Sequence, residues 1–176
     1  MRNLISVAVI LHVAFTAAGL QLNGKEVEFG DMIAYPPVCE MGFITMQHYA
    51  VYVGDKYPGQ GDIFERLKDT ETLSPLCTFS ELDLSYGPYV FNFLDGFVDK
   101  KRRVYTKGTE AQMKARVEEK HAKCGLYDAL SNNCEHLATY VRYGRKISLQ
   151  FNLTGQAFCL SPTARNMWKY VKEMND

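Results

Sequence analysis

Two side chains far apart in this 176-residue sequence have the chemistry of a nucleophile and its base. Cys134 lies in the run SNNCEHL, where a helix is predicted to begin, and His48 lies in QHYAVYVGD, a predicted strand. An imidazole that takes the proton of a thiol turns the sulfur into a nucleophile toward acyl carbon atoms. The pair therefore predicts covalent acyl chemistry.

The predicted helix places the Cys134 sulfur in its first turn. Cys134, Leu137, Ala138 and Val141 recur at the spacing of one helical face, so the thiol is expected to face the core. The unpaired N–H groups and the positive dipole end of that turn favour the thiolate and can contribute to an oxyanion hole. A buried structural cysteine fits the same spacing, so the pattern alone leaves both interpretations open.

His136 is closer to Cys134 in the sequence than His48 is, but it is a poorer candidate for the base. Two residues along a helix rotate the side chain by roughly 200°, which points His136 away from the sulfur. A strand packed against the helix can bring His48 to Cys134 instead.

The elements that must position these residues are short strands followed by helices. Strands are predicted over 27–35, 48–53, 63–67, 90–94 and 103–106, the second and third forming an antiparallel hairpin, and loop is predicted over 68–88. Helices are predicted over 109–123, with a Thr109–Gln112 capping box, over 132–143, closed by Gly144, and over about 161–174. This order predicts an α+β fold in which an antiparallel sheet packs against helices.

Composition narrows the class of protein. With 47% hydrophobic residues, the chain can bury one core, so a single domain is predicted. Its 20 basic and 20 acidic residues balance, and nothing favours a nucleic acid as partner. No Cys-x-x-Cys pair, His-Glu-x-x-His run or glycine-rich phosphate loop occurs in the sequence, so no metal and no cofactor are predicted.

The first residues have the form of an export signal. Arg2 precedes an apolar run that ends in small residues at Gly19, which predicts a secretory signal peptide over 1–19 and a domain over 20–176. In that oxidising, secreted or lumenal setting, Cys134 would be the free thiol, and the other four cysteines could form two disulfides in any of three pairings. Those four cysteines are Cys39, Cys77, Cys124 and Cys159. Asn152 begins the sequon Asn-Leu-Thr, a predicted glycosylation site.

The motifs around Cys134 and His48 resemble a known family. DALSNNCEH, at 128–136, resembles the cysteine motif of the lecithin:retinol acyltransferase family, which includes the HRAS-like suppressor phospholipase/acyltransferases. HYAVYVGD, at 48–55, resembles that family's histidine strand, and GDMI, at 30–33, resembles its first strand. The similarity covers about residues 28–144, with both motifs in the family's order.

The resemblance implies a permuted papain-like fold and a reaction. Cys134 would attack an acyl ester, usually of a glycerophospholipid, to form a thioester, and His48 would activate first the thiol and then the acceptor. Water as acceptor gives phospholipase A activity, whereas an amine, alcohol or lysolipid gives acyl transfer. The implied partners are a phospholipid or other acyl-lipid substrate and, transiently, a membrane surface.

The sequence departs from the family pattern at two points. The family's second histidine, on the strand after the first, is absent here, and Glu65, then Asp62, are the nearest residues that could orient His48. The chain also ends in an amphipathic predicted helix instead of a hydrophobic anchor, so lipid would have to reach the site over an exposed apolar surface, for which Phe91, Phe93 and Phe97 are candidates.

The sequence thus predicts a secreted, thiol-dependent acyltransferase or phospholipase. Two alternatives stay open: a catalytically impaired extracellular binding or signalling module with the same fold, and a peptidase or amidase that uses the same dyad. The acyl donor, the acceptor, the disulfide pairing and the oligomeric state are not fixed by the sequence.

Overall fold

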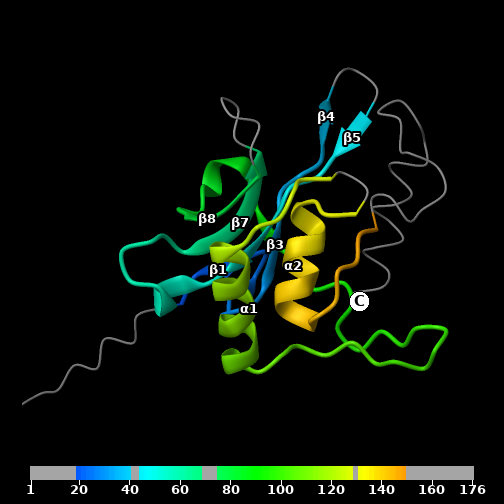
Figure 1. Ribbon diagram of the computed structural model, residues 1–176. Coiled ribbons are helices and arrows are strands. Elements are labelled where there is room, and N and C mark those ends of the chain that lie inside the picture. Colours follow the sequence, from blue (N-terminus) through cyan, green and yellow to red (C-terminus); the bar gives the residue numbers. More distant parts are fainter. Residues whose placement is uncertain (1–18, 41–43, 69–74, 129–130, 150–176) are drawn as a thin grey trace, which may run out of the picture.

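A computed structural model describes residues 19–40, 44–68, 75–128 and 131–149. Figure 1 shows two helices packed on one face of a twisted antiparallel sheet. The five strands of this sheet, in spatial order, are β8 (Pro75–Ser80), β7 (Ile63–Lys68), β6 (Tyr49–Tyr52), β3 (Met32–Ala34) and β9 (Tyr89–Val90). The α+β class and the antiparallel sheet predicted from the sequence are confirmed. No helix in the described part of the chain is long and apolar enough to cross a bilayer.

Two small hairpins accompany the main sheet. One joins β1 (Gln21–Leu22) to β2 (Lys25–Glu26), and the other joins β4 (Val38–Glu40) to β5 (Ile44–Met46). Short 3₁₀ turns η1 (Gly54–Lys56) and η2 (Leu84–Tyr86) follow β6 and β8. The helices are α1 (Glu110–Ala122) and α2 (Cys134–Tyr143).

Side chains alternate along β6 as the sequence predicts. Tyr49 and Val51 join the main core, where the α2 residues Leu137, Ala138 and Val141 pack against them. Ala50 belongs instead to a second cluster on the other face of the sheet, with Leu22, Val27, Ile33 and Ile63. Because successive side chains of a strand point to opposite faces, the sheet separates these two apolar layers.

Both described helices begin and end as predicted, to within two residues. Thr109 and Gln112 form the capping box of α1, and Met113 and Val117 are buried beneath that helix. His121, the third member of the predicted stripe, is exposed at its edge. Gly144 ends α2 in a left-handed conformation (φ 71°), which a glycine adopts without steric cost.

The strand predictions need three corrections. Residues 27–35 contain only the short β3, because Glu28 and Asp31 bond to one another in a turn that precedes it. Residues 90–94 contribute only the end of β9, and 103–106 only a bridge between Val98 and Val104. The prediction of loop over 68–88 missed β8, which pairs with β7 in register from Ile63–Ser80 to Lys68–Pro75. Its proline is the first strand residue, a position that tolerates proline.

Candidate functional site

Cys134 is the first residue of α2, and a local cap fixes it there. The side chain of Asn133 accepts the His136 N–H at 3.0 Å, and its backbone carbonyl accepts the Leu137 N–H at 3.1 Å. An extended Asn133 therefore begins the helix one residue before the cysteine. The Cys134 thiol is free, and the residue is 8% exposed.

His136 is committed to the same cap and does not serve Cys134. Its Nδ1 lies 2.8 Å from the Asn133 side-chain oxygen, and the Asn133 N–H donates to the ring at 3.4 Å. Burial lowers the pKa of His136, with a smaller contribution from Lys146, so the ring is neutral near pH 7. His136 is thus part of the helix cap.

His48 and Glu65 meet across the β6–β7 pair. Glu65 is opposite Ala50 in the strand register, and His48 immediately precedes β6 with the same side-chain parity as Ala50. The His48 Nε2 atom lies 2.6 Å from Glu65 Oε2. Because an ionised carboxylate only accepts hydrogen bonds, Nε2 carries the proton of this contact. Asp62, the other carboxylate considered, instead accepts the Leu82 N–H at 2.6 Å.

The other side of the His48 ring serves the sulfur. Cys134 and Glu65 both interact with the imidazole and raise its pKa. Since Glu65 occupies Nε2, the nitrogen available to Cys134 is Nδ1. The structure therefore places Glu65 in direct contact with His48, and Cys134 near enough to the same imidazole to affect its pKa.

These contacts shift the pKa values of both His48 and Glu65. Desolvation lowers the pKa of His48, but the hydrogen bonds and charges of Cys134 and Glu65 outweigh it and raise that pKa to about 10. Desolvation raises the pKa of Glu65, but hydrogen bonds from His48 and Ser80 outweigh it, so its pKa is lowered. At neutral pH the pair is therefore an imidazolium and a carboxylate.

Gln47 forms one wall of the site beside the sulfur. Its backbone carbonyl accepts the Cys134 S–H at 3.8 Å. Its side-chain amide donates to the Tyr35 carbonyl at 3.0 Å and to the Tyr89 hydroxyl at 2.5 Å, and it accepts from Tyr49 at 3.0 Å. Tyr35 also lies against the His48 ring, with 5.5 Å between centroids. This cluster holds the chain just before β6 in a fixed position.

The segment that leads to Cys134 is attached to β7 and β8. Arg66, which is buried, donates to the backbone carbonyls of Cys124, Gly125 and Leu126 at 3.1, 2.6 and 3.0 Å. Cys124 forms a disulfide with Cys77, the residue opposite Arg66 in the β7–β8 register. The Arg66 cation therefore fixes three consecutive residues to the sheet, and the disulfide fixes the first of them covalently.

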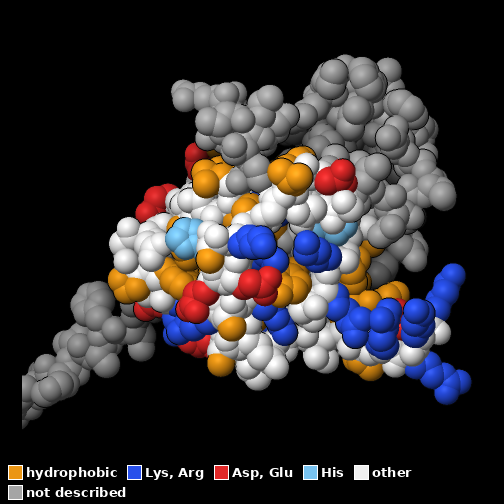
Figure 2. All heavy atoms as spheres, viewed as in Figure 1, with side chains coloured by type: hydrophobic (Ala, Val, Ile, Leu, Met, Phe, Trp, Pro, Cys, Tyr) orange, Lys and Arg blue, Asp and Glu red, His pale blue; other side chains and the backbone are white. Residues whose placement is uncertain are grey.

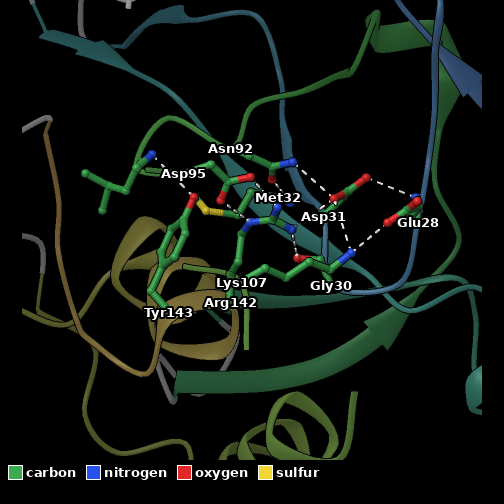
Figure 3. Close-up of polar contacts among 10 residues, drawn as sticks. Glu28, Gly30, Asp31, Met32, Asn92, Asp95, Lys107, Arg142 and Tyr143 are labelled. Carbon is green, nitrogen blue, oxygen red and sulfur yellow. Dashed lines mark hydrogen bonds and ion pairs between the residues drawn. The ribbon is translucent and has the colours of Figure 1, made fainter. Parts of the chain in front are cut away.

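The other end of α2 is held by a buried ionic cluster (Figure 3). The Arg142 guanidinium donates to Asp31 at 2.9 Å, to the Gly30 carbonyl at 2.9 Å and to Asp95 at 2.6 and 2.9 Å. Asn92 bridges Asp31 and β3, through its contacts with the Asp31 carboxylate at 3.0 Å and the Met32 N–H at 2.9 Å. The helix that carries Cys134 is therefore fixed to the start of β3 through its last turn.

A third anchor joins α2 to the chain that follows it. The buried Glu135 carboxylate accepts the Ser148 hydroxyl and the Leu149 N–H, and the Thr139 hydroxyl bonds to both the N–H and the carbonyl of Ile147. Arg66, Gln47, Glu135 and Arg142 are the site supports that sequence reasoning missed. Such supports can be sought in a sequence as charged or amide side chains within otherwise apolar strands and helices, because a buried polar group needs a partner.

Of the predicted disulfides, Cys77–Cys124 is formed. It fits an oxidising, secretory-type environment. The remaining predictions fall outside what the structure describes: residues 1–18 of the predicted 1–19 signal peptide, the Cys39 side chain, Cys159, the Asn152 sequon and the helix at 161–174. Within the described ranges, no group of three His, Cys, Asp or Glu side chains is placed to hold a metal ion.

The exposed apolar surface considered for lipid access is narrower than predicted. Phe91 and Phe93 are buried in the main core, where their rings pack 5.2 Å apart, whereas Phe97 is 43% exposed.

Comparison with known proteins adds no identification, because no protein-family model matches the chain and no curated protein matches it.

Proposed function

We propose that this protein is a thiol-dependent acyltransferase or phospholipase A of the lecithin:retinol acyltransferase type, acting on glycerophospholipid acyl esters. Cys134 is the nucleophile, His48 is the general base and acid, and Glu65 orients and charges the imidazole. The observation that carries the proposal is the His48 ring, whose Nε2 lies 2.6 Å from the Glu65 carboxylate and whose pKa the neighbouring Cys134 helps to raise. This arrangement has the roles of a catalytic triad in nucleophile, base and orienting carboxylate.

The reaction follows from these contacts in two half-reactions. In the reactive state the proton of Cys134 rests on His48 as the imidazolium, so Cys134 Sγ attacks as the thiolate and forms a bond to the ester carbonyl carbon as the carbonyl electrons move to its oxygen. When the carbonyl reforms, the C–O bond to the glycerol oxygen breaks and His48 returns the proton to that oxygen, which releases a lysophospholipid. Water or another acceptor then gives its proton to the neutral His48, attacks the thioester and frees the Cys134 thiolate beside the re-formed imidazolium.

Glu65 takes the place that a second histidine has in the resembled family. A neutral histidine would only orient the ring of His48, whereas a carboxylate also stabilises the imidazolium that forms in each half-reaction. Along with Cys134, Glu65 is the group that raises the pKa of His48 to about 10. The proposed mechanism therefore does not require the missing histidine.

The permuted papain-like fold is part of the same proposal. Three features support it: the histidine precedes the cysteine in the chain, the cysteine begins a helix, and that helix packs on an antiparallel sheet with the histidine at the start of its central strand. The predicted export signal and the Cys77–Cys124 disulfide support a site of action in the secretory lumen or outside the cell.

A non-catalytic binding module is the second candidate, and one observation favours it. The Cys134 thiol is 8% exposed and donates to the Gln47 carbonyl at 3.8 Å, an arrangement that also suits an inert buried thiol. The two candidates differ in the reactivity of Cys134. Alkylation by iodoacetamide at neutral pH that is fast in the wild type and slowed by His48→Gln supports the enzyme, whereas slow alkylation unaffected by His48→Gln supports the module.

Turnover measurements distinguish the lipid reaction from peptidase chemistry. Wild type, Cys134→Ala and His121→Ala are each incubated with a short-chain phosphatidylcholine and with a peptide library. His121 is the matched control, because it is exposed and its ring contacts Phe64 and Phe79. The proposal expects fatty-acid release or transfer that Cys134→Ala abolishes and His121→Ala keeps. Peptide cleavage without lipid turnover would replace the proposal by the amidase alternative.

A further inference from the structure

Residues 96–105 form a hairpin that projects from the body of the protein beside the C-terminal end of α2 (Figure 1). Its arms are joined by backbone bonds between Gly96 and Tyr105, between Tyr105 and Phe97, and between Asp99 and Arg103, all at 2.9 to 3.0 Å. The Asp99 carboxylate closes the turn, since it accepts the Lys101 and Arg103 N–H groups at 2.8 and 3.0 Å. The hairpin is therefore a preformed feature.

The tip of this hairpin concentrates positive charge. Lys100, Lys101, Arg102 and Arg103 are consecutive and all exposed, in a chain whose charges balance overall. Asp99 pairs with Arg103 at 2.5 Å and so offsets one of the four cations. The basic side chains at the lower right of Figure 2 occupy the region where Figure 1 places this hairpin.

Apolar side chains lie directly behind the cations. Val98 and Val104 are paired across the two arms and are 52% and 59% exposed, and Phe97 is 43% exposed. An amphipathic surface of this kind, with cations at its tip and exposed apolar groups behind them, matches a bilayer that has anionic headgroups above an apolar layer. A purely polyanionic partner would give the exposed valines no contact.

The base of the hairpin joins it to the catalytic helix. The buried Tyr105 ring lies 6.2 Å from the ring of Tyr143, the last residue of α2, and the Leu94 N–H donates to the Tyr143 hydroxyl at 3.3 Å. Cys134 stands at the other end of this ten-residue helix, about 15 Å along its axis. The hairpin is therefore suited to hold the domain near a surface, and it does not form the mouth of the site.

We propose that the 96–105 hairpin is a docking element for anionic phospholipid bilayers, with Lys100, Lys101 and Arg102 at the headgroups and Val98 and Val104 below them. The inference deepens the proposed function, on which its biological purpose rests, by naming the surface where the acyl-lipid substrate is met. The physical association itself does not depend on thioester chemistry.

Vesicle co-sedimentation tests this association with the intact secreted protein carrying Cys134→Ala. Vesicles of phosphatidylcholine mixed with phosphatidylserine are compared with vesicles of phosphatidylcholine alone. The protein is expected to bind the anionic vesicles, and Lys100→Gln/Lys101→Gln is expected to weaken that binding on the order of tenfold or more. The matched control, Lys25→Gln/Lys123→Gln, removes the same charge from exposed sites elsewhere and is expected to bind as before.

Two further arms decide the chemical nature of the partner. Val98→Thr/Val104→Thr keeps the charge and is expected to weaken vesicle binding while leaving retention on a heparin column unchanged. Equal vesicle binding by the hairpin and control lysine pairs overturns the proposal, as does heparin retention without vesicle binding. Binding is measured with Cys134→Ala, which carries no nucleophile, and turnover is measured with the wild type on a short-chain lipid. Loss of vesicle binding with turnover intact would reject the docking hairpin alone. Vesicle binding without turnover would reject the proposed reaction alone.

Discussion

The Nε2 atom of His48 lies 2.6 Å from Oε2 of Glu65, on the neighbouring strand of the sheet. Register explains the contact, because Glu65 is opposite Ala50 and β-strand side chains two residues apart share a face. The register of this hairpin thus determines which side chain contacts the imidazole. The predictions below test this pair and the anchors that hold Cys134 beside it.

Replacing Glu65 by glutamine should lower both the pKa of His48 and the rate of acylation. Glutamine keeps the shape of the side chain but removes the charge and allows the wrong imidazole tautomer, a change that costs roughly 10²- to 10⁴-fold in related triads. The His48 pKa is measured by NMR titration and the rate by release of lysolipid. Asp62→Asn is the control, because Asp62 bonds to Leu82 and should leave both values unchanged.

The stability contributed by the His48 contacts should depend on pH in one direction. The pKa of His48 is raised from 6.5 to about 10 in the folded protein, so the stabilisation is complete below pH 6.5 and is lost as pH rises through about 10. Urea unfolding of wild type and His48→Gln gives this contribution as a difference between two proteins. A difference that does not shrink between those pH values would contradict the assigned hydrogen bonds.

Arg142→Met should destabilise the fold severely. The change removes the buried cation that pairs with Asp31 and the side-chain donor of the Gly30 carbonyl, and removing one partner of a buried ion pair costs about 3 to 5 kcal/mol. The control is Arg103→Met, whose partner Asp99 lies in the exposed hairpin and whose loss should cost under about 1 kcal/mol. Denaturant unfolding measures both, and equal losses would reject the anchoring role of Arg142.

Removing the disulfide should lower stability by about 4 kcal/mol, because it closes a loop of 47 residues in the unfolded chain. The double substitution Cys77→Ala/Cys124→Ala and reduction of the wild type should give similar shifts in the unfolding midpoint. A Cys134→Ala protein should keep the full response to reductant, since its disulfide is intact. If reduction does not alter the midpoint, the Cys77–Cys124 bond does not stabilise the fold in solution.

The sequence was most informative where a local rule has a single outcome. The caps at Thr109 and Gly144 and the alternation along β6 depend on hydrogen bonds and geometry within a few residues, and both helices and the central hairpin were predicted from them. β8 was missed because its strand character comes from pairing with β7 over its whole length. The strand propensity of residues 68–88 alone does not reveal that they pair with β7.

The supports of the site were beyond local rules for the same reason. Arg66 contacts carbonyl groups 58 to 60 residues away, and Arg142 reaches Asp31 over a separation of 111 residues. Neither partner can be paired from spacing in the sequence. Strand register likewise determines that Glu65, and not Asp62, contacts His48. This register could not be fixed from the sequence, because the length of the turn between the two strands was uncertain.

The most direct test of the central claim is intact-mass spectrometry of the protein after brief incubation with a phospholipid mixture, followed by peptide mapping. The account predicts a mass increase of one acyl chain, located on Cys134, removed by neutral hydroxylamine, and absent in Cys134→Ala and His48→Gln. An unmodified Cys134 in a protein that nevertheless releases fatty acid, or an equal adduct in His48→Gln, would contradict it.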